Sequence, residues 1–394
     1  MTLRYSERMD AFGTSIIREL FALAMNPEII TLAGGAPAPE LYPIEAFSKA
    51  SAKAFEEYGI PMIAYDTTDG YEPLRKIIAE ERMTSVGVDT SSANIFITTG
   101  SQQGIDFSGR LFLDKGDLVI VESPTYLGAV NSFDSYQCRY AEVPMDENGM
   151  ITEVLEDVLK KNPEAKMIYI NPDFQNPTGL SMGRERRKAL VDLATAYNVP
   201  IVEDSPYIEM RYEGEKIPSV KSFDTSGIVI YLGSFSKICA PGVRLGWICA
   251  SDELLPKYNK IKQACDLHSS TICQRQLTKY MEMYSLDEQI KKMIPAYKLK
   301  RDTMMEIMEN EFPDSVSFTR PEGGFFTWVT VPEKYDTVEL FKKAVEKKVA
   351  FVPGAPFFVE KGHDNHMRVN YSFMPVDKVA EGTKRLAKLL QSLD

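Results

Sequence analysis

Residues 228–250 read IVIYLGSFSKICAPGVRLGWICA, and this stretch decides the fold. It places two apolar runs, Ile228–Leu232 and Trp247–Ala250, on either side of fourteen residues rich in Ser, Pro and Gly. Parallel neighbours in a sheet need a crossover connection, usually a helix, and a loop of this composition disfavours one. We therefore predict that the second run is a strand antiparallel to the first.

Towards the N-terminus, helical patterns alternate with short apolar runs. This alternation is typical of a mainly parallel sheet with crossover helices. It predicts an α/β fold with a seven-stranded sheet, mainly parallel, in which the Trp247 strand is the one antiparallel member. Six strands are expected at Ile95–Thr98, Leu118–Glu122, Met167–Ile170, Ile201–Glu203, Ile228–Leu232 and Trp247–Ala250, and helices at Pro43–Tyr58, Glu72–Thr84, Gln103–Phe112, Thr125–Ser135, Ile151–Lys160 and Gly183–Tyr197.

The pattern changes after about residue 285, where a long polar helix is expected over Ser285–Glu311. Shorter elements follow it, and a chain of 394 residues is long enough for two cores. We predict a large domain at 43–284, a smaller α+β domain at 285–394, and an N-terminal arm at 1–42 that completes part of the small domain. The elements expected after the long helix are Val316–Thr319, Gly324–Val331, Thr337–Lys347, Val349–Val352, Met367–Tyr371 and a final helix from Pro375.

The loop between the two opening strands carries the first candidate site. Ser234, Ser236 and Lys237 follow the first strand, and Arg244 comes just before the second. Two hydroxyls and a guanidinium around a lysine make an anion site beside an amine. A lysine amine condenses with an aldehyde when its surroundings lower its pKa. A loop lysine alone is an ordinary surface residue as often as it is a reactive amine. The hypothesis therefore depends on the spacing of the two serines, the lysine and the arginine.

Other strands also end in polar residues, at the edge where open α/β sheets bind ligands. The turn 99–104, TGSQQG, leads into a helix whose start attracts phosphate. Asp204 follows another strand, and a buried carboxylate there keeps a pyridine nitrogen protonated. Tyr207 and Asn176 are candidates for the ring's phenolic oxygen, and Tyr126 for stacking on the ring face. Each is common in turns or cores, but their joint occurrence after strands indicates one cofactor site.

Charge and histidine content exclude several other functions. The net charge of −11 disfavours nucleic acid and acidic membranes as partners. The basic run KLKR at 298–301 is interpreted as a solvated helix face. His363 and His366 are interpreted as surface-loop residues, so no metal site is expected.

Cysteine usage and the distribution of apolar residues indicate the compartment. The five cysteines lack C-x-x-C spacing, which favours free, buried thiols in a reducing compartment. Residues 1–13 contain no apolar leader, and no run approaches 18 apolar residues. A soluble, cytoplasmic protein is expected.

Taken with its longer motifs, the chain resembles the fold-type-I aminotransferases of class I/II that use pyridoxal phosphate (PLP). It is most similar to the 2-aminoadipate (LysN-like) and kynurenine/aminoadipate branch. The resemblance covers nearly the whole chain. The combination of the motifs SFSK at 234–237 and NPTG at 176–179 is highly specific. The motifs are SIIREL at 15–20, AGGAPAPELYP at 33–43, NPTG at 176–179, SFSK at 234–237 and MRVNY at 367–371.

The resemblance implies a role for each matching residue. Lys237 is the lysine that forms an imine with the cofactor and then moves protons, Asp204 pairs with the ring nitrogen, and Tyr126 stacks on the ring. Asn176 and Tyr207 are expected to hold the phenolic oxygen, with Asn176 also near the substrate. The residues expected around the phosphate are Ser101, Gln102, Ser234, Ser236, Arg244 and, from the partner subunit of an active homodimer, the residue matching Tyr65.

For the substrate, the resemblance assigns Arg368 to the α-carboxylate and the Gly34–Gly35 loop to the pocket wall. Arg18 matches an arginine that reads a distal carboxylate, although an ordinary helix-surface arginine remains an alternative. The resulting expectation is broad transamination of 2-aminoadipate or glutamate, with leucine or aromatic amino acids also possible donors and 2-oxoglutarate as acceptor.

Two alternatives stay open at this stage. The same residues serve PLP enzymes such as β-lyases or decarboxylases, which differ in their products. A non-enzymatic regulator of this branch would carry an N-terminal DNA-binding domain of roughly 60–100 residues. The present sequence reaches the Gly34–Gly35 loop after about thirty residues, which disfavours that reading.

Overall fold

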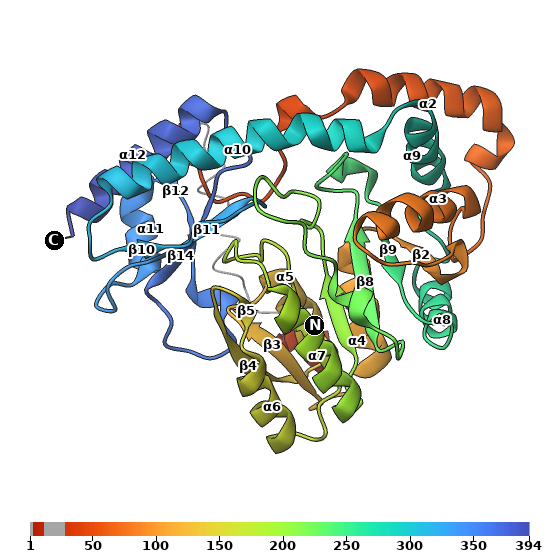
Figure 1. Ribbon diagram of the computed structural model, residues 1–394, viewed down its shortest axis with the longest axis horizontal. Helices are drawn as coiled ribbons and strands as arrows, with labels where there is room; N and C mark the ends of the chain where they lie inside the picture. Colours follow the sequence, from red (N-terminus) through yellow and green to blue (C-terminus); the bar gives the residue numbers. More distant parts are fainter. Residues whose placement is uncertain (1–2, 12–27, 394) are drawn as a thin grey trace.

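The structure is a computed structural model that describes residues 3–11 and 28–393. A large sheet with helices on both faces lies beside a smaller sheet, and helix α10 (Leu286–Glu311) runs from the side of the large sheet to the small one (Figure 1). The SIIREL motif at 15–20, with Arg18, lies outside the described residues.

The large sheet has the strand order β2-β9-β8-β7-β6-β3-β4-β5. Strand β9 runs antiparallel to both of its neighbours, β2 and β8, so the prediction for the Trp247 strand is confirmed. The loop between β8 and β9 holds only a three-residue 3-10 helix, η7 (Pro241–Val243), and no crossover helix. The strands are β2 (Ile95–Thr98), β3 (Leu118–Ser123), β4 (Arg139–Asp146), β5 (Gly149–Met150), β6 (Met167–Ile170), β7 (Ile201–Asp204), β8 (Val229–Ser234) and β9 (Gly246–Cys249).

The sheet has eight strands, one more than predicted from the sequence. Strand β4 pairs parallel with β3, and the short β5 pairs antiparallel with β4 at the sheet edge, which adds a second antiparallel strand. Strand β4 reads RYAEVPMD and has one buried residue, Val143. Strands near an edge mix polar and apolar residues, so β4 lacks the apolar run that marks the central strands.

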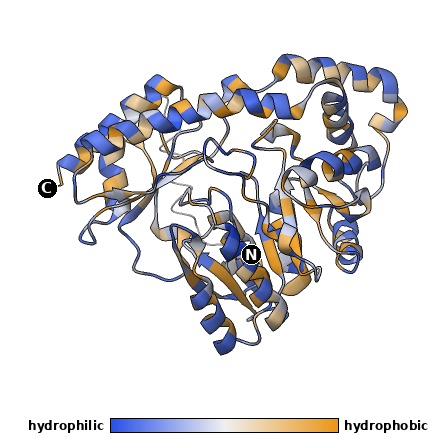
Figure 2. Ribbon diagram, viewed as in Figure 1, coloured by the Kyte–Doolittle hydropathy of each residue, from blue (hydrophilic) through white to orange (hydrophobic). Residues whose placement is uncertain are grey.

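Helices on the two faces of the sheet enclose two separate cores. Successive strand residues point to opposite faces, so Val119 and Val121 of β3 join one core while Leu118 and Ile120 join the other. The apolar stripes along the central strands are visible in Figure 2. The helices of this part are α2 (Ile44–Tyr58), α3 (Glu72–Ile77), α4 (Ser101–Phe112), α5 (Leu127–Asp134), α6 (Thr152–Lys161), α7 (Arg184–Tyr197), α8 (Leu255–Cys265) and α9 (Thr271–Met283).

Three helical segments differ from the sequence expectation. The helix expected over Glu72–Thr84 is α3 followed by one π-helical segment, η4 (Ile78–Met83). Helices α8 and α9 were not expected at all. The buried face of α9 includes Gln274, Arg275 and Lys279, so the apolar periodicity that marks a helix is weak there. Further 3-10 segments are η1 (Glu7–Ala11), η2 (Pro39–Leu41), η3 (Ile60–Met62), η5 (Ser92–Asn94), η6 (Val220–Phe223) and η8 (Ala355–Phe357).

The smaller sheet has the order β10-β11-β14-β13, with all pairs antiparallel. Strand β1 (Ile30–Thr31) pairs with β12 (Val349–Ala350), and the amide of Asn370 donates to the carbonyl of Leu32. The chain near residue 30 therefore lies within this part of the molecule. The other elements are β10 (Ser317–Phe318), β11 (Phe326–Thr330), α11 (Thr337–Glu346), β13 (Val352–Pro353), β14 (His366–Asn370) and α12 (Val376–Gln391).

The basic run at 298–301 corrects the expectation of a solvated helix face. Lys300 and Arg301 are only 5% exposed at their side chains. Lys300 Nζ donates to Glu40 Oε1 at 2.7 Å and to the Ser372 carbonyl, while Arg301 pairs with Glu213 at 2.8 Å and also donates to a carbonyl. Buried cations need such partners. Lys300 and Arg301 thus link α10 to Glu40 of the N-terminal segment and to Glu213 of the large domain.

The cysteines and histidines also differ in part from expectation. All five thiols are free, but only Cys239 and Cys249 are buried, and Cys265 is exposed. His366 lies in β14 and stacks on Trp328, while His363 stacks on Phe358 in the preceding loop. Over residues 3–11 and 28–393, no cluster of three or more metal-binding side chains occurs. None of the helices described is both long enough and apolar enough to cross a membrane.

Candidate active site

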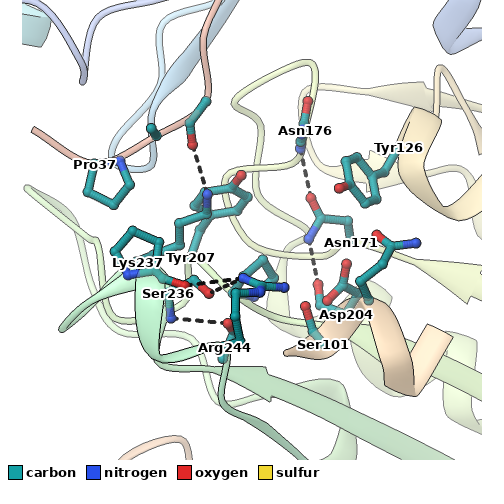
Figure 3. Close-up of a pocket in the computed structure, with 16 residues that line it drawn as sticks. Pro37, Ser101, Tyr126, Asn171, Asn176, Asp204, Tyr207, Ser236, Lys237 and Arg244 are labelled. Atoms are coloured by element: carbon teal, nitrogen blue, oxygen red, sulfur yellow. Dashed lines mark hydrogen bonds between the residues drawn. The ribbon is translucent and has the colours of Figure 1, made fainter. Parts of the chain in front are cut away.

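A cavity of about 390 Å³ opens at the carboxyl ends of the central strands (Figure 3). Strand ends, the starts of two helices and the 35–37 loop from the other sheet all contribute to its wall. Most candidate residues named from the sequence meet here. The lining residues are Gly35, Ala36, Pro37, Ser101, Gln102, Tyr126, Asn171, Asn176, Asp204, Pro206, Tyr207, Ser234, Ser236, Lys237, Pro241 and Arg244.

Lys237 follows β8 and projects into this cavity. Its Nζ donates to the carbonyl of Gly35 at 2.7 Å (Figure 3). The rings of Tyr207 and Phe325 lie within 6 Å of this nitrogen. Removal from water, followed by the charge of Arg368, lowers the pKa of the Lys237 amine to about 8, against the opposing charge of Asp204. An amine of this kind is neutral, and hence nucleophilic, far more often than an ordinary lysine at neutral pH.

Asp204, the last residue of β7, is the acidic group of the cavity. Its Oδ2 accepts a hydrogen bond from the Tyr169 hydroxyl at 2.9 Å, while Oδ1 is buried and has no hydrogen-bond partner among the described residues. Burial raises the pKa of Asp204 to about 7, although the hydrogen bond from Tyr169 and the charge of Lys237 lower it. A buried acceptor without a partner costs stability. A cationic N–H donor in the cavity would satisfy it.

A loop after β6 brings two asparagines to the same cavity. The backbone N–H of Asn176 donates to Asn171 Oδ1 at 2.7 Å, and the backbone N–H of Asn171 donates in turn to Glu122 Oε2. Gln175 also donates to that carboxyl oxygen at 3.0 Å. These bonds fix the Asn176 side chain beside Tyr207, whose pKa is raised by burial.

Hydroxyls, backbone amides and a guanidinium gather at another end of the cavity. Ser101 and Gln102 begin α4, where backbone N–H groups lack helical partners. Arg244 Nη1 donates to Ser236 Oγ at 3.4 Å, and the Ser236 amide donates to Ser234 Oγ at 3.1 Å. Donors around a helix start make a site for an anion such as phosphate.

Two glycines keep this anion site open. A Cβ on Gly100 would lie 2.6 Å from Arg244 Nη2, and one on Gly246 would lie 2.7 Å from the Ser101 amide. The backbone of Gly100 also has a φ of 76°, which L side chains rarely adopt. A side chain at either position would displace the donors that face the cavity.

Tyr126 caps the start of α5 on the wall of the cavity (Figure 3). Burial raises the pKa of its hydroxyl, so the side chain is neutral at ordinary pH. Its ring is available as an aromatic surface for a planar ligand.

Arg368 of β14 lies behind Asn176. Its Nη1 donates to Asn176 Oδ1 and its Nη2 to the Ala33 carbonyl, both at 2.8 Å, while Nε has no partner among the described residues. The guanidinium sits 4.3 Å from the centre of the Phe326 ring. A Cβ on Gly35 would meet the same ring at 3.1 Å, whereas Gly34 has open space around it. Arg368 is therefore a buried cation with a donor to spare.

One cofactor candidate, Tyr65, does not line this cavity from within the chain. Tyr65 is 87% exposed and packs edge-on against His268. Arg18 lies outside the described residues. The cavity thus gathers every other cofactor candidate from one chain, with Arg368 adjacent.

Sequence reasoning missed four residues that support the site: Tyr169, Asn171, Glu122 and Gln175. Tyr169 and Glu122 sit inside strands of apolar neighbours, where their side chains look like ordinary sheet residues. Asn171 was visible as the first polar residue after β6, the same signal that singled out Asp204 after β7. Only the paired strands show which of these side chains meet.

Comparisons with known proteins agree with this geometry. Residues 28–386 match the family described as aminotransferase class I and II. The chain is 42% identical over 391 residues to aromatic-amino-acid aminotransferase 1 of Thermococcus litoralis, covering 98% of this chain and 94% of the relative.

Two solved structures share both fold and sequence with the chain. Kynurenine aminotransferase of Pyrococcus horikoshii, solved in complex with PMP, has a TM-score of 0.94 and 38% identity, covering 99% of this chain and 97% of that one. LysN, the α-aminoadipate aminotransferase of Thermus thermophilus, was solved with N-(5'-phosphopyridoxyl)-L-leucine. Its TM-score is 0.90 at 36% identity, again covering 99% of this chain and 97% of that one.

Proposed function

The chain belongs to the class I and II aminotransferases, and from that premise we propose that it transfers amino groups from both acidic and large apolar amino acids to 2-oxoglutarate. The protein is a PLP-dependent aminotransferase. The donors proposed are 2-aminoadipate, glutamate, leucine and aromatic amino acids. The observation that carries the proposal is the cavity in which the Lys237 amine, Asp204 and the Asn176–Arg368 pair converge.

The residues present fit PLP. Asp204 Oδ1 is a buried acceptor that has no hydrogen-bond partner in the described part of the chain, which suits a protonated ring nitrogen. The Lys237 amine, with its pKa lowered to about 8, suits an aldehyde. The open cradle at Gly100 and Gly246 beside Arg244 suits a phosphate. We assign Ser101, Gln102, Ser234, Ser236 and Arg244 to that phosphate, Asn176 and Tyr207 to the phenolic oxygen, and Tyr126 to the ring face.

PLP supplies an aldehyde that condenses with amines and a cationic ring that withdraws electrons. Residues of the chain then transfer the proton, hold a charge at the ring nitrogen and orient the cofactor. Lys237 Nζ, the amine in the cavity, takes the proton from the substrate Cα and returns it on the cofactor side. Asp204 holds its negative charge at the ring nitrogen and keeps the proton there. Tyr126 and the Asn176 loop would hold the cofactor in a set orientation relative to Lys237.

Arg368 supports the assignment of an α-amino acid substrate. Its Nη1 and Nη2 donate to Asn176 and to the Ala33 carbonyl. Its Nε, which has no partner within residues 3–11 and 28–393, is a donor for a carboxylate. Phe326 lies against the guanidinium and limits its movement. An arginine fixed in this way binds a carboxylate in a set orientation. Gly34 and Gly35 leave room on the same side for the substrate.

The dual preference for acidic and apolar donors rests on the relatives and on Arg18. One relative is named for aromatic amino acids and another for α-aminoadipate. We propose that Arg18, which is outside the described residues, reads a distal carboxylate. Arg18→Ala should then raise KM for 2-aminoadipate by at least tenfold and leave KM for leucine unchanged. Arg368→Lys serves as the matched control and should raise KM for both donors. Equal effects of Arg18→Ala on both donors would refute this assignment.

The experiment that tests the reaction is a panel of amino acids with 2-oxoglutarate. Formation of glutamate and of the donor's oxo acid supports transamination, and Lys237→Ala should abolish it together with the visible absorption band and borohydride trapping of PLP. Pyruvate and ammonia formed without an acceptor would favour the alternative β-lyase chemistry. A purified protein that stays colourless with excess PLP would overturn the proposal.

We also propose a homodimer and a reducing, cytoplasmic location. Ile60, Ile63 and Tyr65 are each more than 70% exposed on one short segment, and Leu267 is exposed close to His268, which Tyr65 contacts. An apolar face of this kind suits a second copy of the chain, with Tyr65 reaching the partner's phosphate site. The free thiols, including exposed Cys265, support a reducing compartment.

A further inference from the structure

We propose that Tyr169 is a positioning residue for the reaction: its hydroxyl holds Asp204 as an aimed carboxylate and so favours the protonated form of the cofactor's ring nitrogen. This inference rests on the proposed role of Asp204 at that nitrogen. It assigns a role to a residue that lines no part of the cavity and that the sequence alone does not single out.

The geometry leaves the Tyr169 hydroxyl one partner. Tyr169 lies in β6, fully buried, and its hydroxyl oxygen is 2.9 Å from Asp204 Oδ2 on the neighbouring strand β7. An edge-to-face contact with Phe133, with ring centres 5.7 Å apart, holds the tyrosine ring in place. A carboxylate only accepts hydrogen bonds, so the hydroxyl donates. Burial strongly raises the pKa of Tyr169, which keeps this donor protonated.

The two oxygens of Asp204 have different surroundings. Oδ2 is bound to Tyr169, while Oδ1 has no partner among the described residues and belongs to a side chain that lines the cavity (Figure 3). A donor on one oxygen withdraws charge from the other. The Tyr169 hydroxyl therefore sets the proton affinity of the oxygen that faces the ligand, which a merely space-filling tyrosine would not do.

The direction of the effect follows from one proton shared by two bases. In the site, the proton lies either on the ring nitrogen, facing a carboxylate, or on Asp204, facing a neutral ring. A hydrogen bond to the charged carboxylate stabilises the first arrangement. Loss of that donor raises the pKa of a carboxyl group that burial already holds high. The proton then moves towards Asp204, and the ring loses part of its power to withdraw electrons.

The surrounding charged and titratable groups do not replace this donor. Lys237, after β8, contributes an opposing charge that lowers the pKa of Asp204, but its amine donates to the Gly35 carbonyl and not to this carboxylate. Tyr126, at the start of α5, is not among the groups that lower the pKa of Asp204. Asn171 donates to the backbone carbonyl of Asp204, not to its carboxylate. The Ser101 hydroxyl also lowers the pKa of Asp204 through a hydrogen bond. Tyr169 is the donor whose hydroxyl lies 2.9 Å from Oδ2, so its removal tests that hydrogen bond.

The test uses the PLP-loaded enzyme with nitrogen-15 in the cofactor ring. Tyr169→Phe should move the ring-nitrogen NMR signal from the protonated towards the neutral position, and should lower kcat about tenfold with little change in KM. Replacing Tyr169 by a fluorotyrosine, a stronger donor, should shift the signal in the opposite direction. An unchanged ring-nitrogen signal in Tyr169→Phe would overturn the inference, whatever happens to activity.

Two controls separate this inference from its premise. Tyr258→Phe removes another fully buried hydroxyl, bonded to Ser108 at 2.9 Å in the same core, and should leave the nitrogen signal unchanged. Asp204→Asn should convert the ring nitrogen to its neutral form. If Asp204→Asn moves the signal and Tyr169→Phe does not, only the role of Tyr169 fails. If neither moves it, the proposed role of Asp204 fails first.

Discussion

At the scale of single residues, our proposal makes the Lys237 amine the group that sets the pH at which the apo-protein captures PLP. The neutral amine is the reactive form, and its pKa of about 8 lies well below the usual lysine value. About one amine in ten is then neutral at pH 7, against far fewer for an ordinary lysine. The capture rate, followed by stopped-flow absorbance, should rise with pH and level off just above pH 8. A free lysine peptide serves as the control, and a plateau delayed to about pH 10 would contradict the lowered pKa.

Some residues of the site could be predicted from the sequence, and others could not. Lys237, Asp204, Asn176 and Arg244 stand next to strand ends and within recognisable motifs, and the structure brings them to one cavity. Tyr169 could not be found that way. A tyrosine within the strand MIYI has the composition of an ordinary core residue, and its functional meaning depends on the register that places it beside β7. Pairing across strands is a property of the folded chain.

At the scale of elements, the loop that carries Asn176 depends on helix α7. Arg187 of that helix is fully buried and donates to Asp173 at 2.7 Å and to the carbonyls of Pro172, Met182 and Pro218. Removal of one partner from a buried ion pair costs about 3–5 kcal/mol. Arg187→Met should lower the free energy of unfolding of the apo-protein by that amount in urea, and should also weaken PLP binding.

Arg184, exposed on the same helix, provides the matched control. Arg184→Met should leave both the free energy of unfolding and the PLP affinity within about 0.5 kcal/mol of the parent. Full stability in Arg187→Met would show that the loop is held by Glu122 and Gln175 without help from α7. A stable variant that nevertheless binds PLP poorly would assign Arg187 to loop placement alone.

Elements were predictable where their apolar pattern was strong. The strands Ile95–Thr98 and Met167–Ile170 and the long helix α10 lie where the sequence predicted them. Helix α9 and strand β4 escaped notice because polar residues occupy buried or edge positions. The KLKR run was misread for a related reason. Charge pattern alone does not show that Lys300 and Arg301 face Glu40 and Glu213 across a buried contact.

At the scale of the whole molecule, the site lies between the eight-stranded sheet and the part of the chain that holds the four-stranded sheet. Lys237 and Asp204 come from the large sheet, whereas Gly35 and Arg368 come from the side of the small one. The Lys237–Gly35 and Arg368–Asn176 hydrogen bonds both join these two sides. A ligand that contacts both Lys237 and Arg368 is therefore bound by the side of the large sheet and by the side of the small sheet together.

Association of two chains is the property on which the complete site depends in our proposal. The segment bearing Ile60, Ile63 and Tyr65 is tied to the start of α9 by the hydrogen bond from Thr271 to the Met62 carbonyl. A charge placed on this exposed apolar face cannot be buried without a partner. Ile63→Asp should therefore shift the protein from dimer to monomer in sedimentation velocity, and weaken PLP binding at least tenfold.

Two further variants make that result specific. Leu299→Asp places the same charge on α10, at a residue that is also exposed, and should leave the sedimentation coefficient and PLP affinity unchanged. Tyr65→Phe keeps the apolar face and should remain dimeric. It should bind PLP more weakly, because our proposal places the Tyr65 hydroxyl at the partner's phosphate site. A monomeric parent protein would refute the dimer. A dimeric Tyr65→Phe with unchanged PLP affinity would leave the dimer intact and remove Tyr65 from the cofactor site, because the interface and the phosphate contact are separate consequences of one exposed segment.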